Sequence, residues 1–350
     1  MKTILKTIIG TAALLISAAA CDKWTEQRPV DFDYLTIKDK NPALYESYMQ
    51  SIRDYHATEH QVLIARFDNK DGVLSGRADH LTCLPDSVDY VVLNNADLVS
   101  AQILEEMNTI ATEKSIPTLI PVDYEALMKE LNLYIEDVEA QNAELEEGSE
   151  PVVVDKAEWL SAKASAFTAK ASEYGVAGIM VCFEGINPLG LNTERKAAET
   201  TLQEAFFAPL EKWVDERGGL FFFQGAPTNL LIESDILSKA RYIIIPAESV
   251  TTVVGLDYKV GMACGTGVPT DRFVIGVTAF DVTDETATDG LFSGGISAIE
   301  GAGRWAVSPA SGFSKKGVCV NHAQFDYYNI TNVYSEIGKA IATMNPSPVR

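Results

Sequence analysis

Cysteine and histidine are scarce in this chain of 350 residues, and their spacing is not that of metal ligands. There are four histidines, no CxxC motif and no Cys/His cluster, and the five cysteines lie far apart, at Cys21, Cys83, Cys182, Cys264 and Cys319. Structural zinc sites usually carry closely spaced ligands. The sequence therefore predicts no metal site and no cofactor. The cysteines after Cys21 are expected to be buried free thiols, unless the fold pairs two of them.

Basic residues are too few for a surface that binds nucleic acid. The chain has 28 basic and 49 acidic residues, a formal net charge of −21 at pH 7. This charge repels nucleic acid and anionic lipid headgroups, so neither is an expected partner. A neutral glycan remains compatible with such a surface.

A long apolar run is confined to the amino terminus. Residues 8–20 are apolar, follow Lys2 and Lys6, and precede Cys21, which is typical of a secretory signal. The segment Ile16–Cys21 resembles a bacterial lipobox, in which the cysteine is lipidated; the alternative is an ordinary signal with an incidental cysteine. We predict a signal peptide (1–20), a lipidated tether (21–44) and one folded domain (45–350), attached to the membrane only through lipid on Cys21.

Eight apolar, strand-like runs follow, mostly separated by amphipathic helical patterns. The runs are His60–Phe67, Val88–Leu93, Thr118–Pro121, Val176–Phe183, Leu220–Phe223, Tyr242–Ile245, Phe273–Ala279 and Gly317–Val320. The helical patterns include Val99–Glu113, Lys156–Tyr174, Thr193–Arg217 and Thr331–Met344. This alternation predicts a single-domain (β/α)8 TIM barrel. A doubly wound open sheet is the weaker alternative, because no Gly-rich phosphate loop follows a strand.

The acidic segment from Asp137 to Glu150 interrupts this rhythm before the fourth run. It predicts a solvated loop or the exposed end of a helix, since a run of like charges is usually a solvated surface. No internal repeat of 20–50 residues is evident, so the acidic segment is the one marked shift in composition within a single domain.

The fourth run ends on a single carboxylate, in a pattern that resembles a known catalytic motif. Glycoside hydrolase family 18, the chitinases and endo-β-N-acetylglucosaminidases, carries D-G-x-D-x-D-x-E on the fourth strand of a (β/α)8 barrel. Residues 177–184 of this chain read A-G-I-M-V-C-F-E in the same frame. Gly178 and Glu184 match the motif, whereas Ala177, Met180 and Cys182 stand where the family has aspartates.

The resemblance implies that Glu184 would be the general acid of a hydrolase. In the family, this glutamate protonates the leaving oxygen, and the substrate's own 2-acetamido group is the nucleophile. The aspartate two residues earlier orients the acetamide and stabilises its developing positive charge. The thiol of Cys182 is mostly neutral at pH 7 and does neither. Loss of one such stabiliser typically costs about 10²–10³ in rate. The family's usual tyrosine on the sixth strand is also missing, since P-A-E follows Ile245.

The amino terminus carries a second resemblance. The segment Cys21–Glu26, with the later Tyr45–Tyr55, is similar to the opening of surface lipoproteins of this family from the Bacteroidetes. This implies a lipid-anchored protein of the outer membrane, exposed at the cell surface, that works beside an outer-membrane glycan importer.

Ligand contacts in a barrel come from the C-terminal ends of its strands. Amides and carboxylates suit sugar hydroxyls, and an aromatic face can stack on a pyranose. The predicted carbohydrate-binding residues are Asn94, Asp97, Tyr124, Glu184, Gln224, Glu248 and Trp305, the last placed after a glycine-rich loop. Further polar residues at strand ends are Asp68, Asn69, Asn95, Asp123, Asn187, Asp281, Asn321, His322 and Gln324. For each residue singly, an ordinary polar loop position is the alternative interpretation.

Three functions remain open. The favoured one is a catalytically impaired barrel that captures GlcNAc-containing oligosaccharides such as N-glycans. The second is an active endo-β-N-acetylglucosaminidase with Glu184 as acid, or with a new carboxylate pair formed with Glu248 or Asp281. The third is a scaffold protein that binds no sugar.

Overall fold

The computed structural model describes residues 36–146, 149–284, 286–310, 312–329 and 331–346. The predicted signal peptide, Cys21 and the tether as far as residue 35 lie outside these ranges. The chain divides into two units, Met1–Tyr48 and Met49–Arg350. The described part of the first unit contains helix α2 (Ile37–Lys40) and the start of helix α3 (Pro42–Ala57). The side chain of Thr36 caps α2 by accepting a hydrogen bond from the backbone N–H of Asp39 at 3.2 Å.

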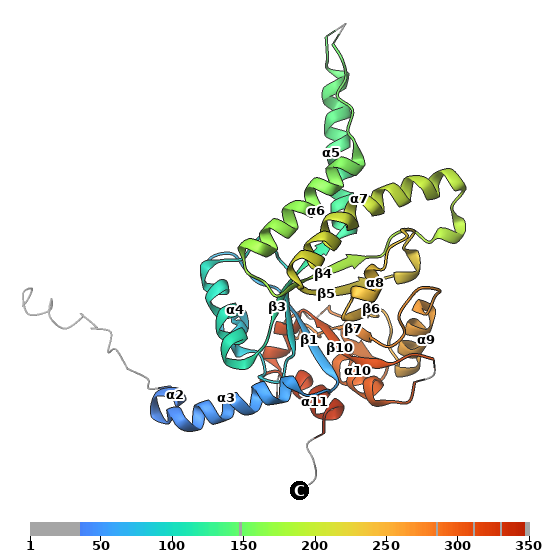
Figure 1. The fold of residues 1–350 in the computed structure, drawn as a ribbon. Helices are drawn as coiled ribbons and strands as arrows, with labels where there is room; N and C mark the ends of the chain where they lie inside the picture. Colours follow the sequence, from blue (N-terminus) through green and yellow to red (C-terminus); the bar gives the residue numbers. More distant parts are fainter. Residues whose placement is uncertain (1–35, 147–148, 285, 311, 330, 347–350) are drawn as a thin grey trace, which may run out of the picture. The chain divides into compact units, whose positions relative to one another are not determined.

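Eight parallel strands of the second unit close into a barrel (Figure 1). In chain order these are β1 (Val62–Phe67), β2 (Tyr90–Leu93), β3 (Thr118–Asp123), β4 (Gly178–Phe183), β5 (Leu220–Gly225), β6 (Tyr242–Pro246), β7 (Phe273–Thr278) and β10 (Lys315–Asn321). A small antiparallel pair, β8 (Leu291–Phe292) and β9 (Ile296–Ser297), lies in the connection between β7 and β10. All eight predicted strands and the predicted TIM barrel are confirmed. Because β1 is bonded to both β2 and β10, β5 is the strand opposite β1 across the barrel.

Helices connect the strands and cover the outside of the barrel. They are α4 (Ala101–Lys114), α5 (Tyr124–Ala143), α6 (Lys156–Glu173), α7 (Thr193–Arg217), α8 (Ile236–Lys239), α9 (Val253–Ala263), α10 (Ala298–Val307) and α11 (Ser335–Met344). Short 3₁₀ helices add η1 (Arg77–Asp79), η2 (Leu81–Cys83), η3 (Pro188–Gly190), η4 (Pro227–Asn229) and η5 (Ala323–Tyr328). The four predicted helical patterns correspond to α4, α6, α7 and α11. No helix within the described ranges has the length and apolar character that a membrane crossing needs.

The acidic segment before β4 begins inside a helix. Residues 137–143 form the last turns of α5, which Figure 1 shows extending away from the barrel. The next helix, α6, begins at Lys156. The prediction of an exposed helix end at this place is therefore correct.

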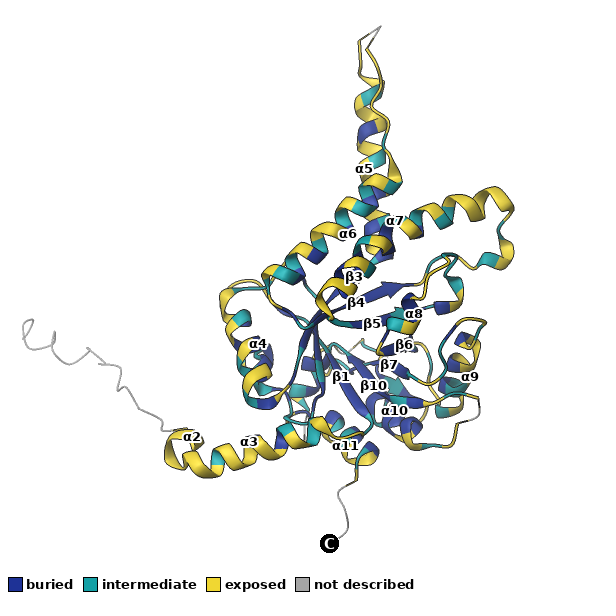
Figure 2. Cartoon of the chain, in the orientation of Figure 1, coloured by how far each residue is buried: buried dark blue, intermediate teal, exposed yellow. Residues whose placement is uncertain are grey.

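Alternation along the strands separates two apolar cores, and Figure 2 shows the strands as the most completely buried part of the barrel. On β4, Met180 and Cys182 belong to the core inside the barrel, with residues of β1, β2, β3, β5, β6, β7 and β10. Ile179, Val181 and Phe183 belong to the larger core between the strands and the helices. Side chains two apart on a strand share a face, so the residue at 184 continues the interior row beyond the strand end.

Candidate functional site

The side chain of Arg66 extends from β1 across the mouth of the barrel, which is the opening formed by the C-terminal ends of the strands. Its Nε donates a hydrogen bond to Asn94 Oδ1 at 2.8 Å, just beyond the end of β2. Its Nη1 donates to Gln224 Oε1 at 2.9 Å on β5. Because β5 lies opposite β1, the side chain reaches across the barrel to make both bonds. The guanidinium therefore lies in the middle of the mouth, near enough to the interior thiols Cys182 and Cys319 to oppose the rise in their pKa values.

The two interior thiols are chemically inert. Burial raises the pKa of Cys182 and of Cys319 to about 12, and the charge of Arg66 only partly offsets this effect. Since the thiolate is the nucleophile, neither cysteine attacks a substrate at neutral pH, and Cys182 provides no negative charge. The expectation of free thiols is confirmed for all four described cysteines. The expectation of burial holds for these two, whereas Cys264 is exposed.

Beside Arg66, Asp68 gathers a group of polar side chains at the ends of β1, β2 and β10. Its Oδ1 accepts a hydrogen bond from Asn94 Nδ2 at 2.6 Å, and its Oδ2 lies 2.5 Å from His322 Nδ1 and accepts from Gln324 Nε2. Burial opposes ionisation of Asp68, but these three hydrogen bonds outweigh it and lower the pKa of the carboxyl group. The group is accessible, because 24% of the Asp68 side chain and 38% of the His322 side chain are exposed.

The backbone fixes the position of Glu184 directly after β4. The N–H groups of Glu184 and Gly185 donate to Glu125 Oε1 at 3.0 and 2.8 Å. The carbonyl oxygen of Glu184 accepts from Asn229 Nδ2 at 2.6 Å. Gly185 has a positive φ of 56°, which suits a residue without Cβ at this sharp turn. The loop after β4 is thus held by side chains from the β3 and β5 connections.

The carboxyl group of Glu184 lies among like charges. Its pKa is raised above the usual value, first by partial desolvation and then by the charge of Glu125, with smaller contributions from Glu248 and Asp123. Lys259 opposes the rise. A raised pKa is the property that a general acid needs near neutral pH. The neighbouring carboxylates therefore raise the pKa of Glu184 by like-charge repulsion, as an aspartate at position 182 would do in the family motif.

The predicted binding residues separate into two groups. The fold places Asn94 and Gln224 on Arg66, and it places Glu248 close enough to Glu184 to act on its pKa. Asp97 does not join them, because it is exposed and pairs with Lys170 of α6, on the outer layer. Tyr124 is 4% exposed and packs against Phe183 and Phe206 at ring distances of 5.0 and 5.1 Å. Asp281 accepts hydrogen bonds from the backbone N–H and the hydroxyl group of Thr283 in its own loop.

The prediction that Trp305 stacks on a sugar is wrong. Trp305 lies in helix α10, not after a loop, and has 0% exposure. Its Nε1 donates to Asp257 Oδ1 at 2.8 Å, and the same oxygen pairs with Lys315 Nζ at 2.8 Å. Lys315 begins β10, so Trp305 packs near the N-terminal end of that strand, whereas ligands enter at the C-terminal ends.

Sequence reasoning missed Arg66, Glu125 and Lys259. Arg66 carried a signal, because it is the one charged residue in the apolar run Val62–Phe67 and has the parity of the interior residue Ile64. A charge facing the inside of a barrel near a strand end points to a functional site. Glu125 lies two residues after β3 and could have been counted with the strand-end residues, whereas Lys259 lies inside helix α9 and carried no comparable signal.

A cavity of about 470 Å³ adjoins the loop after β4. Its lining comes from the start of α5, the loop itself and α7, and includes Glu125, Asn132, Leu133, Ile186 and Glu199. Tyr124 also lines it, and its buried hydroxyl group has no hydrogen-bond partner within the described residues. The lining mixes apolar and polar groups, and Gly185 of this lining directly follows Glu184.

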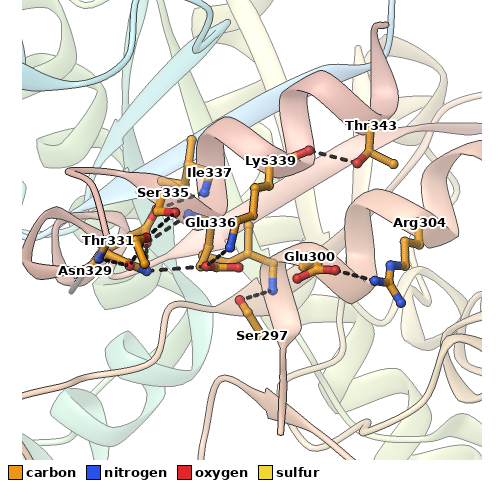
Figure 3. A network of polar contacts seen from close by, with 12 residues as sticks. Ser297, Glu300, Arg304, Asn329, Thr331, Ser335, Glu336, Ile337, Lys339 and Thr343 are labelled. Atoms are coloured by element: carbon orange, nitrogen blue, oxygen red, sulfur yellow. Dashed lines mark hydrogen bonds and ion pairs between the residues drawn. The ribbon is translucent and has the colours of Figure 1, made fainter.

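A second cavity, of about 380 Å³, lies between α10, η5 and α11. Its polar groups bond to one another: Glu336 Oε1 pairs with Lys339 Nζ at 2.8 Å and accepts from Asn329 Nδ2, as Figure 3 shows. Asp326 is 5% exposed and accepts from the backbone N–H groups of Glu336 and Ile337 at the start of α11. Because these polar groups already form hydrogen bonds with one another, fewer of them are free to bind a ligand here than in the barrel mouth.

Three comparisons place the chain among known proteins. The family model described as glycoside hydrolase family 18, BT1044-like, matches residues 25–343. A search of curated proteins finds no match. Among solved structures, a selenomethionine form of BT1044 with one glutamate-to-glutamine substitution is 17% identical, with a TM-score of 0.62 over 89% of this chain and 96% of that one.

Two further structures have the same fold. The endo-β-N-acetylglucosaminidase from Cordyceps militaris is 17% identical, with a TM-score of 0.59 over 86% of this chain and 96% of that one. A chitinase from Bacteroides thetaiotaomicron is 11% identical, with a TM-score of 0.50 over 83% and 98%. At these identities the structural matches establish the barrel alone, whereas the family model covers most of the chain.

Proposed function

The chain belongs to glycoside hydrolase family 18, and from that premise we propose that it binds a GlcNAc-containing glycan, such as an N-glycan, in the barrel mouth without cleaving it. The ligand is expected to lie over Arg66 and the Asp68 group and to extend towards Glu184. Amides, carboxylates and a guanidinium at these places match sugar hydroxyls, which both donate and accept hydrogen bonds.

One observation supports the proposal that the protein does not cleave its ligand: the positively charged side chain of Arg66 lies in the middle of the mouth. In the substrate-assisted reaction of the family, the transition state carries positive charge on the sugar and its acetamide. Carboxylates on the barrel interior stabilise that charge, whereas a guanidinium repels it and can only donate hydrogen bonds. Cys182, at the place of the nearest aspartate, is neutral. The donors of Arg66 suit the oxygens of a neutral sugar in its ground state.

A second function, an active endo-β-N-acetylglucosaminidase, is favoured by one feature. Glu184 retains the raised pKa of a general acid, first because it is partly desolvated and then because of the charges of Glu125 and Glu248. Such an enzyme would need another group to stabilise the acetamide, and Glu248 is the candidate because its charge acts on the pKa of Glu184. A scaffold that binds no sugar is the remaining alternative, and the absence of any glycan affinity would identify it.

The proposed location follows from the amino terminus. We propose that Cys21 is lipidated and anchors the protein to the outer membrane with the barrel at the cell surface. In that position a glycan-binding barrel would deliver oligosaccharides to an outer-membrane importer. Replacement of Cys21 by serine should release the protein from the membrane fraction, as fractionation of labelled cells would show.

Calorimetry of a soluble form that begins after Cys21, titrated with a high-mannose and with a complex N-glycan, tests the binding proposal. We expect saturable binding of at least one of them, and an Arg66→Met variant that binds at least about tenfold more weakly, since a hydrogen bond to a charged group contributes about 1.5–3 kcal/mol. Trp305→Phe is the matched control: it should melt at a lower temperature but bind the glycan with unchanged affinity. No heat with either glycan, or a binding loss in Trp305→Phe equal to that in Arg66→Met, would contradict the proposed site.

A further inference from the structure

A buried group of three potential metal ligands lies at the opposite end of the barrel from the mouth. His56 is in the last turn of α3, His60 lies two residues before β1, and Asp89 lies directly before β2. One ligand atom from each lies within 4.8 Å of the others, the only such group of three or more within the described residues. The side chains are 6%, 9% and 5% exposed, respectively. The sequence prediction of no metal site considered spacing alone, whereas the fold brings Asp89 to both histidines.

When both histidines are neutral, their hydrogen bonds leave an unprotonated nitrogen of each ring facing the carboxylate of Asp89. His56 Nε2 lies 2.9 Å from the carbonyl oxygen of Asp86, and His60 Nδ1 lies 2.8 Å from that of Thr58. A carbonyl oxygen only accepts, so each of these nitrogens carries the N–H. In a neutral imidazole the other nitrogen is then an acceptor. These other nitrogens, His56 Nδ1 and His60 Nε2, face the same oxygen, Asp89 Oδ1, at 3.2 and 2.6 Å.

A shared cation resolves this conflict between three acceptors. We propose that His56 Nδ1, His60 Nε2 and Asp89 Oδ1 bind one divalent transition-metal ion of the zinc class. Zinc prefers imidazole nitrogen and carboxylate oxygen at about 2.0–2.2 Å, which places two tetrahedral ligands roughly 3.3 Å apart. The 3.2 Å contact already has that spacing, and the 2.6 Å contact needs to open by roughly 0.7 Å.

The groups around the three residues would hold the metal ligands in their orientation. Metal-bound histidines usually donate their other N–H to a carbonyl or carboxylate, as His56 and His60 do. The second carboxylate oxygen, Asp89 Oδ2, accepts from the Leu63 backbone N–H at 2.8 Å, which fixes the orientation of the ligand. A cavity of about 650 Å³ reaches all three residues and gives the ion an entry path and room for a water as fourth ligand.

The ion would join the end of α3 to the starts of β1 and β2. The ion would not belong to the proposed glycan site, since the mouth is formed by the other ends of the strands. The site is therefore structural, and binding to the folded state alone makes the melting temperature rise with the logarithm of the metal concentration.

Metal analysis of the same soluble form, residues 22–350, prepared without a histidine tag, tests this proposal. After equilibration with Zn²⁺ and gel filtration, we expect one zinc per chain and a melting temperature that rises with Zn²⁺ concentration. A His56→Gln, His60→Gln double variant should lose the bound zinc and the rise. The affinity for zinc should fall by more than the roughly 10–100-fold that is lost when a group hydrogen-bonded to a metal ligand is removed. The other two histidines provide the matched control: His80→Gln, His322→Gln should retain both properties.

Co²⁺ gives a test on the unmodified chain, in case the double variant does not fold. Nitrogen and oxygen ligands in a tetrahedral site predict visible cobalt absorption without a thiolate charge-transfer band. A thiolate band would assign the metal to a cysteine and overturn the proposal. Absence of bound Zn²⁺ and of any change in melting temperature would overturn it as well, and would mean that protons, not a metal, lie between the histidines and Asp89. Glycan binding is measured separately, so either result leaves the proposed function open.

Discussion

At the scale of single residues, Arg66 strengthens the conclusion that the altered motif does not support catalysis. The loss of one aspartate at position 182 removes a stabilising charge, which other carboxylates could replace. A guanidinium held between Asn94 and Gln224 has the opposite effect, because it adds positive charge where the transition state is positive. A Cys182→Asp substitution alone would therefore place the aspartate beside Arg66, and the resulting ion pair would neutralise the negative charge that the transition state needs.

Glu184 provides the pH-dependent prediction at this scale. Its pKa is raised by desolvation and by Glu125, Glu248 and Asp123, so it should titrate above the usual glutamate value of about 4.3. In a Glu248→Gln variant one like charge is removed, and the pKa should fall towards the usual value. Carbon-detected NMR of the glutamate carboxyl groups over a pH series measures both. An unchanged pKa in Glu248→Gln would show that the two carboxyl groups do not interact, and would remove the remaining candidate for a carboxylate pair.

At the scale of elements, strand β4 explains why the motif's glycine remains when its aspartates are gone. Gly178 pairs with Leu220 of β5, and a Cβ at position 178 would lie 2.1 Å from the Leu220 carbonyl oxygen. No side chain fits there without moving the backbone of β5. The glycine is therefore a requirement of the barrel, and its presence says nothing about catalysis.

Replacement of Gly178 by alanine should destabilise the barrel. Overpacking of a well-packed interior costs about 1–3 kcal/mol, and contact with backbone rather than with a flexible side chain favours the upper end. Gly338→Ala is the control, because a Cβ there meets nothing within 4 Å and the residue lies inside helix α11. That variant should be neutral or slightly more stable. Chemical denaturation of both variants gives the comparison, and equal stabilities would contradict the steric account of Gly178.

Helix α10 shows where element prediction from the sequence failed. Its glycines suggested a loop, since glycine disfavours helices in isolation. In the fold they permit close packing: a Cβ at Gly301 would lie 2.3 Å from the Phe292 ring, and one at Gly303 would lie 3.0 Å from Ala340 Cα of α11. Tertiary packing overrides propensity here, and Trp305 is buried for the same reason.

At the scale of the whole molecule, the fold was accessible from the sequence and the site only partly. The eight apolar runs and their spacing determine the barrel, because each strand must be buried on both faces. Strand ends also located Asn94, Gln224 and Glu184 in one mouth. The sequence does not show how far apart side chains on different strands lie across the barrel. The reach of Arg66 from β1 to β5 and the meeting of His56, His60 and Asp89 depend on contacts between distant segments, which no local pattern records.

The measurement that tests the central claim most directly is mass analysis of an N-glycan after long incubation with the mature, unmodified protein. We predict that the glycan is recovered intact at protein concentrations that saturate binding, with no product cleaved between the two core GlcNAc residues. Cleavage that disappears in a Glu184→Gln variant would contradict the account. It would mean that the barrel is an enzyme whose acetamide is stabilised by other groups, and that Arg66 does not prevent catalysis.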